Sequence, residues 1–197
     1  MKYDFYAYTD KALKYLRRLF ITEFNRVSMQ IRTDSLNVIQ ATTALYDKLQ
    51  RETIRVFLKI AKQKYRELTG GEDTITEMWL LGFLSESNPL TGYVFLNDIE
   101  RKRQYYTEGL LSGDDISKET KKALRYWYSS VKQYADLVAD ESALKAYSDM
   151  SVANVEWITN LDGKECYICH ERNGVIYPIT NVPKKPHYGC RCYVRRV

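Results

Sequence analysis

The sequence contains little proline, glycine or histidine, and it has no long apolar run. Only four prolines and nine glycines occur in 197 residues, which excludes the composition of a wholly disordered or collagen-like chain. Hydrophobic residues make up 45% and charged residues 28%, as in ordinary soluble proteins. No apolar segment approaches the roughly 20 residues that a membrane-spanning helix needs, so we expect no membrane contact.

The first residues also lack the features of a secretory signal. The segment Met1-Lys-Tyr-Asp-Phe-Tyr-Ala-Tyr8 contains no apolar core of the kind that signal peptides have. We therefore expect the protein to be made and kept in the cytosol of its producer. Cysteines are reduced there, so clustered cysteines favour a metal site over disulfide bonds.

Acidic residues are missing from the end of the chain, residues 184–197, although the net charge of the whole chain is only +5. The five basic residues of this segment are Lys184, Lys185, Arg191, Arg195 and Arg196. They are candidate contacts to nucleic-acid phosphates, and a solvated charged end explains them equally well. Tyrosine is abundant, with 17 residues, often close to cations. Such tyrosines suit helix–helix contacts or could stack on unpaired bases.

Apolar residues at three- and four-residue steps predict helices over the first three quarters of the chain. The first is expected over residues 13–31. The second is expected over residues 34–69, with a cap in Thr33-Asp34-Ser35 and an end at Gly70-Gly71. If it is continuous, the second helix is roughly 50 Å long. That length suits an elongated bundle.

Shorter helices are predicted to follow. Thr74-Ile-Thr-Glu77 has the form of a capping box. The apolar segment 78–84 after it predicts a helix that is buried among others. Further helices are expected over residues 98–111, 116–138 and 141–150.

The helical pattern ends near residue 152, where glycine, proline and cysteine appear. Strands are predicted over residues 155–159, 175–177 and 193–194. We therefore expect a mainly α protein, with an elongated helical body (1–152) and a small α+β C-terminal domain (153–197). Some 45 residues are too few to be held by core burial alone, so we expect bound zinc to stabilise this domain.

All four cysteines and both histidines lie between residues 166 and 192. Zinc prefers four sulfur or nitrogen ligands in a tetrahedron. The candidate ligands, of which four would bind, are Cys166, Cys169, His187, Cys190 and Cys192. The four cysteines are the first choice, and the alternative replaces Cys192 with His187. Full coordination by protein groups leaves no open position, which predicts a structural Zn²⁺ site. The other interpretation is reduced cysteines that bind nothing.

Other uses of these cysteines fit the sequence less well. Cys166-x-x-Cys169-His170 matches the c-type haem attachment pattern, but such haem is attached after export and two cysteines would be left over. No βαβ context supports a redox C-x-x-C. A metal-dependent nuclease needs a histidine outside the ligand set, and only His170 could serve. We therefore expect a protein that is not an enzyme.

The residues around the cysteines resemble the C-terminal motif of a known family. Glu156-Trp157-Ile-Thr159, Asp162, Gly174 and Pro186-His187-x-x-Cys190-Arg191-Cys192 resemble the phage head morphogenesis family, the Mu F-like minor capsid proteins of tailed bacteriophages. The resemblance covers about residues 139–192. There are two departures. An Arg-Thr-Glu element is replaced by Ala139-Asp140-Glu141, and a common proline by Tyr188.

The resemblance implies a minor head protein of a phage or prophage, assembled in the bacterial cytoplasm and located inside the virion head. It implies a structural role in head morphogenesis, genome packaging or genome delivery. The implied partners are the portal, other capsid or scaffolding proteins and packaged DNA, with no small-molecule substrate. The alternative hypothesis is a stand-alone zinc module that binds nucleic acid.

Overall fold

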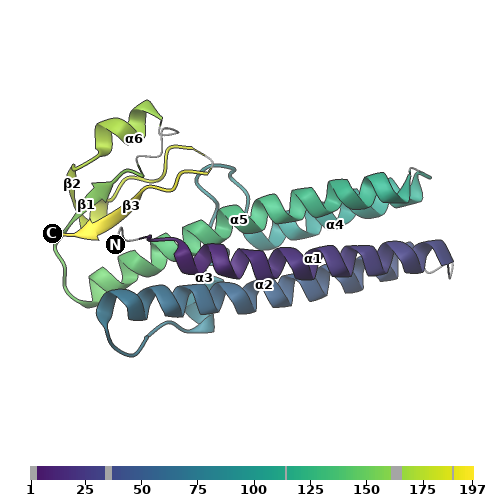
Figure 1. Cartoon of the computed structure of the whole chain (residues 1–197), viewed down its shortest axis with the longest axis horizontal. Coiled ribbons are helices and arrows are strands. Elements are labelled where there is room, and N and C mark those ends of the chain that lie inside the picture. Colours follow the sequence, from purple (N-terminus) through teal and green to yellow (C-terminus); the bar gives the residue numbers. More distant parts are fainter. Residues whose placement is uncertain (1–3, 34–36, 114, 161–165, 188) are drawn as a thin grey trace.

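A computed structural model shows a long helical bundle with a small sheet at one end (Figure 1). The structure describes residues 4–33, 37–113, 115–160, 166–187 and 189–197. The helices are α1 (Ala7–Thr33), α2 (Val38–Thr69), α3 (Glu77–Leu84), α4 (Phe95–Leu111), α5 (Ile116–Asp149) and α6 (Tyr167–Arg172). Helices α1, α2, α4 and α5 pack side by side along the long axis. Within the described residues, no helix has the length and apolarity that crossing a membrane requires.

The predictions for the first two helices are confirmed. Helix α2 is continuous over 32 residues, about 48 Å at 1.5 Å per residue. Residues 34 and 35, where a cap was predicted, lie outside the described residues. The Asn37 side chain caps α2 by accepting hydrogen bonds from the backbone N–H groups of Ile39 and Gln40. The helix ends at Gly70, whose φ of 70° suits a residue without a Cβ atom.

The prediction of two separate helices over 116–138 and 141–150 is wrong, because α5 runs unbroken from Ile116 to Asp149. The polar residues Asp140 and Glu141 interrupt the apolar pattern without interrupting the helix. Ala139 is fully buried, and Asp140 bonds to groups from both ends of the chain. A polar side chain with tertiary partners is compatible with a helix interior.

Helix α3 differs from its prediction in two ways. Its N-cap is Thr76, which accepts a hydrogen bond from the Trp79 backbone N–H at 3.1 Å, so the expected capping box is displaced. The helix is also not buried on every side. Leu80 is buried, but Met78 is 82% exposed and Leu81 is partly exposed. The helix packs on α2, and one neighbour cannot cover all its faces.

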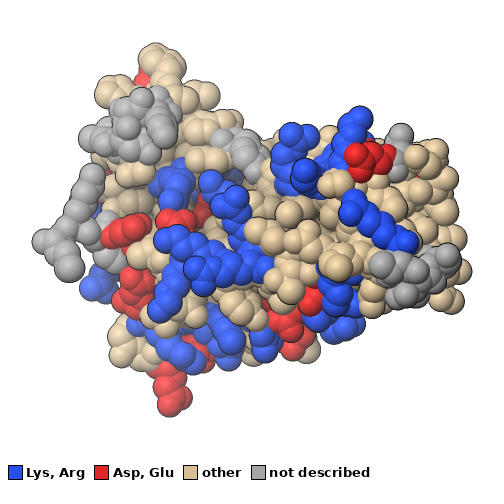
Figure 2. Space-filling model, turned by 45° about the vertical axis from the view of Figure 1, so that its right-hand side comes forward, with Lys and Arg blue, Asp and Glu red and all other residues tan. Residues whose placement is uncertain are grey.

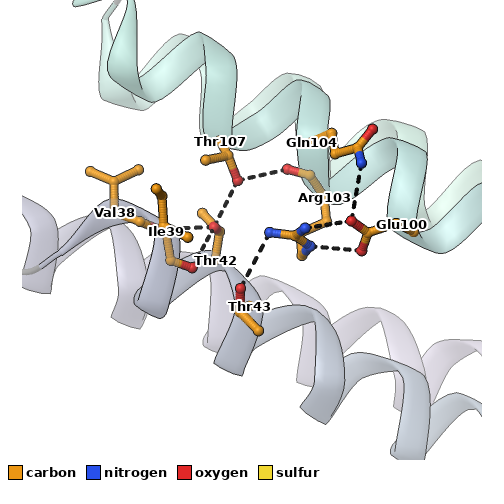
Figure 3. A network of polar contacts seen from close by, with 8 residues as sticks. All are labelled: Val38, Ile39, Thr42, Thr43, Glu100, Arg103, Gln104 and Thr107. Carbon is orange, nitrogen blue, oxygen red and sulfur yellow. Dashed lines mark hydrogen bonds and ion pairs between the residues drawn. The ribbon is translucent and has the colours of Figure 1, made fainter.

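A polar network joins α2 to α4 within the bundle (Figure 3). The hydroxyls of Thr42 and Thr107 lie 2.7 Å apart and are buried. The Arg103 guanidinium donates to the Thr43 hydroxyl at 3.2 Å and forms an ion pair with Glu100 on its own helix. Around this network the core is rich in aromatic rings. The Trp127 ring, for example, meets Phe20 and Tyr46 edge-on.

The C-terminal segment forms a three-stranded antiparallel sheet of order β2-β1-β3. The strands are β1 (Asn154–Ile158), β2 (Ile176–Pro178) and β3 (Tyr193–Arg196), which confirms all three predicted strands within one or two residues. A short 3₁₀ helix, η1 (Ile179–Asn181), follows β2. Helix α6 was not predicted. The proposed boundary at residue 152 falls between α5 and β1.

Candidate metal centre

Three parts of the C-terminal segment bring the cysteines and one histidine together. Cys166 precedes α6 and accepts a hydrogen bond from the Cys169 backbone N–H on its sulfur, so the C-x-x-C spacing forms the first turn of α6. Cys190 and Cys192 lie directly before β3, and His187 precedes them. Because β1 pairs with both β2 and β3, the sheet places the two halves of the motif side by side.

Two overlapping groups of side chains could hold a metal ion. The first is Cys166, Cys169 and His187, and the second is Cys169, Cys190 and Cys192. Within each group the ligand atoms lie within 4.8 Å of one another. The Cys169 sulfur belongs to both groups. It is 3.4 Å from His187 Nε2 and 3.5 Å from the Cys190 sulfur.

These distances fit a tetrahedral ion. All four cysteines are free thiols. A separation of 3.5 Å is far longer than the roughly 2.05 Å of a disulfide. It is close to the roughly 3.8 Å that separates two sulfurs bound to one zinc at 2.3 Å in a tetrahedron. Cys169, Cys190 and Cys192 are buried, while Cys166 and His187 are half-buried. A single ion would take four of the five side chains, and Cys169 is common to both predicted sets.

The thiols also have strongly unequal pKa values. Burial raises the pKa of Cys169 to about 12. Hydrogen bonds to neighbouring groups, first among them Cys190, lower the pKa of Cys192 to about 5. The pKa of Cys190 is raised because its thiol hydrogen-bonds to Cys192. One thiolate is thus stabilised by the thiols around it. A divalent cation would replace the protons of the neighbouring thiols and release them to solvent on binding.

Residues beside the cluster hold its loops in place. The Thr159 hydroxyl donates to the Cys169 carbonyl at 2.6 Å. Gly174 has a φ of 79°, a conformation that favours glycine, and its N–H donates to the Trp157 carbonyl. Asp162, one of the residues of the resemblance, lies outside the described residues. His170 is exposed on α6 and belongs to neither group of ligands.

A triad formed by the buried Tyr6 and the half-buried Asp140 and Lys185 ties this cluster to the helical bundle. The Tyr6 hydroxyl donates to Asp140 at 2.6 Å and lies 3.1 Å from the Cys192 carbonyl. Lys185 pairs with Asp140 at 2.5 Å and donates to the Cys190 carbonyl at 3.0 Å. The triad therefore bonds to the backbone of two candidate ligands. Nothing in the sequence links Tyr6 to the cysteines, because the contact depends on the tertiary fold.

Three of the five basic residues at the end of the chain have acidic partners within the molecule. These ion pairs are Lys185–Asp140 at 2.5 Å, Arg191–Asp10 at 3.0 Å and Arg195–Glu156 at 2.6 Å. Lys184 and Arg196 are exposed. Most of the charge that suggested nucleic-acid contact at this end is therefore balanced locally.

Three comparisons with known proteins found no match. No family model, no curated protein and no solved structure matches the chain.

Proposed function

We propose that the Cys/His cluster binds one structural Zn²⁺ ion, and that the protein is a non-catalytic minor head protein of a tailed phage or prophage. The observation that carries the zinc proposal is the position of the Cys169 sulfur, which belongs to the first half of the motif and lies within 3.5 Å of two ligand atoms of the second half, His187 Nε2 and the Cys190 sulfur. Sulfur and imidazole ligands favour zinc over the hard cations, which prefer oxygen.

The ion would supply the cohesion that the small C-terminal unit lacks. Apart from Val155, Trp157 and Val194, few apolar side chains of the sheet are buried. Zinc bound by residues on both sides of β2 would close the loop between Cys169 and Cys190. Because Lys185 and Tyr6 hydrogen-bond to carbonyls of the ligand segment, a closed loop would also hold the unit against α5 and the start of α1.

The head-protein proposal is supported by the residues of the resemblance and by their placement. Trp157 and Gly174 bond to each other through the backbone, and Thr159 bonds to Cys169. Motif positions that are separated in sequence thus form one unit around the cysteines. An elongated helical body that ends in such a unit suits a protein that acts by contacting the portal and other capsid or scaffolding proteins. Packaged DNA is a further proposed partner.

The second hypothesis, a stand-alone zinc module that binds nucleic acid through its C-terminal cations, has less support. Lys185, Arg191 and Arg195 each have an acidic partner, so phosphates would have to displace carboxylates.

Mass spectrometry of purified particles tests the head-protein proposal. Particles from a lysogen or phage that encodes this chain should contain it in a few copies per portal, and proheads should contain it before DNA is packaged. A strain encoding Cys169→Ser should yield fewer mature heads, whereas a strain encoding His170→Ala, altered at an exposed site nearby, should yield normal numbers. Absence of the chain from both proheads and virions would overturn the proposal.

A further inference from the structure

Positive charge is concentrated on two helices that are far from the cysteines in sequence. Helix α1 contains six basic and two acidic residues, and α2 contains seven and three. Together they carry a net charge of +8, while the whole chain carries +5. The rest of the molecule is therefore net negative. Lys and Arg outnumber Asp and Glu on the face drawn in Figure 2. A segregation of this kind creates a positive potential over one side of the protein.

Part of this charge, from Lys11, Arg55 and Lys59, lines a groove between α1 and α2. The groove has a volume of about 430 Å³. Its lining residues are Tyr8, Lys11, Ala12 and Tyr15 from α1, and Arg55, Val56 and Lys59 from α2. Lys14 and Arg18 are exposed on α1, and Arg51 is exposed on α2. By helical spacing, Arg18 lies one turn beyond Tyr15.

Few carboxylates compete for these cations. Glu52 pairs with Arg55 at 2.7 Å, and Asp10 pairs with Arg191 in the C-terminal unit. Within the part of the chain that the structure describes, Lys11 and Lys59 have no ion-pair partner.

The two tyrosines of the groove are exposed, as are Tyr93, Tyr105, Tyr126 and Tyr167 elsewhere on the surface. Tyr8 is 36% and Tyr15 is 48% exposed, while Tyr46, Tyr65, Tyr106 and Tyr134 are buried in the bundle. Tyr8 and Tyr15 are seven residues apart, about 10 Å along the helix, so both rings border the same groove. Arg55 donates to the Tyr15 hydroxyl at 3.3 Å, which orients that ring. Exposed rings interleaved with cations provide stacking for bases and neutralisation for phosphates.

We propose that the groove between α1 and α2 binds single-stranded nucleic acid. In this arrangement Lys11, Arg18 and Lys59 contact phosphates, while Tyr8 and Tyr15 stack on unpaired bases. A duplex keeps its bases stacked internally, so it would contact only the cations of the groove and not its tyrosine rings. This inference stands apart from the head-protein proposal, since it uses neither the cysteines nor the residues of the resemblance.

Fluorescence anisotropy with a labelled oligo(dT) about 20 nucleotides long, enough to cover one site of 4–16 nucleotides, tests the proposal on the full chain. Wild-type protein should bind the oligonucleotide more tightly than a duplex of the same length. The triple variant Lys11→Gln/Arg18→Gln/Lys59→Gln should lose at least tenfold in affinity. Its slope of log affinity against log salt should fall by about 2, since three phosphate contacts are removed.

A matched control removes the same charge elsewhere. The triple variant Lys118→Gln/Lys121→Gln/Arg125→Gln alters exposed cations of α5 and should change the affinity less than twofold. Tyr8→Ala and Tyr15→Ala should each weaken binding about fivefold or more, because stacking contributes about 1–3 kcal/mol per base. Tyr8→Phe should bind as the wild type does.

Four results would overturn the proposal. They are no binding of the oligonucleotide, equal losses in the groove and control variants, binding of the duplex at least as tight as that of the single strand, and binding of anionic lipid vesicles in place of the oligonucleotide. Failure here would leave the particle experiment unaffected, and absence of the chain from particles would leave this binding unaffected.

Discussion

The ion pair between Lys185 and Asp140 leads to the most specific stability prediction. The two side chains are 10% and 17% exposed, and their charged atoms are 2.5 Å apart. Lys185→Met keeps most of the side-chain volume but leaves the Asp140 carboxylate without its nearest cation. Breaking a buried ion pair in this way costs about 3–5 kcal/mol. Because Tyr6 still donates to Asp140 and some solvent reaches the pair, we expect a loss of about 2–4 kcal/mol in the free energy of unfolding at pH 7.5.

The loss should depend on pH in a defined direction. Burial raises the pKa of Asp140, and Lys185 is the first of the groups that lower it. The substitution therefore raises the pKa further. A carboxyl whose pKa is higher in the folded protein than in the unfolded chain stabilises the fold below its unfolded pKa, and that stability is lost as pH rises through the folded pKa. The cost of Lys185→Met should consequently be smaller at pH 5 than at pH 7.5.

Urea unfolding in the presence of zinc, followed by tryptophan fluorescence at both pH values, provides the measurement. Lys184→Met is the matched control, because Lys184 is exposed beside Lys185 and should cost less than about 0.5 kcal/mol. Equal effects of the two substitutions, or a loss at Lys185 that does not vary with pH, would refute the reasoning about the buried pair.

Three further predictions concern other parts of the fold. Burial, followed by the nearby Asp140 charge, raises the pKa of Glu141 to about 7. Glu141→Gln should therefore raise the unfolding free energy by about 1–3 kcal/mol at pH 8 and by little at pH 4.5, with the exposed Glu108→Gln as a control in the same urea titrations. Thr42→Val and Thr107→Val should each cost about 1 kcal/mol, and a double-mutant cycle should show that their effects are less than additive, because the hydroxyls share a hydrogen bond. Gly82→Ala should stabilise the protein by about 0.5–1 kcal/mol in thermal unfolding, since nothing lies within 4 Å of the added Cβ; a lower melting temperature would contradict this.

Local patterns in the sequence predicted α1, α2 and the three strands correctly. The three- and four-residue apolar spacing of α1 and α2 reflects burial of one helix face, as at Leu16, Phe20 and Leu49. The alternation in β1 likewise reflects the buried Val155 and Trp157. The cysteine spacing predicted which sulfurs would gather, because a C-x-x-C turn and a second cysteine pair need only one hairpin between them.

Contacts between distant segments were not predictable in the same way. The continuity of α5 depends on partners for Asp140 that come from both ends of the chain. The pairing of Arg191 with Asp10 removed a cation that sequence alone left available for nucleic acid. Neither the exposed face of α3 nor the groove beside Tyr15 appears in a local pattern, since both depend on which helix packs on which.

The zinc content of the purified protein tests the central claim most directly. We expect inductively coupled plasma mass spectrometry to find about one zinc per wild-type chain, and almost none in Cys169→Ser, because Cys169 belongs to both groups of ligands. Comparing Cys192→Ser with His187→Ala then identifies the fourth ligand as the side chain whose removal releases more metal. A wild-type chain that stays free of zinc after growth with added zinc, or a Cys169→Ser chain that keeps a full equivalent, would contradict the account.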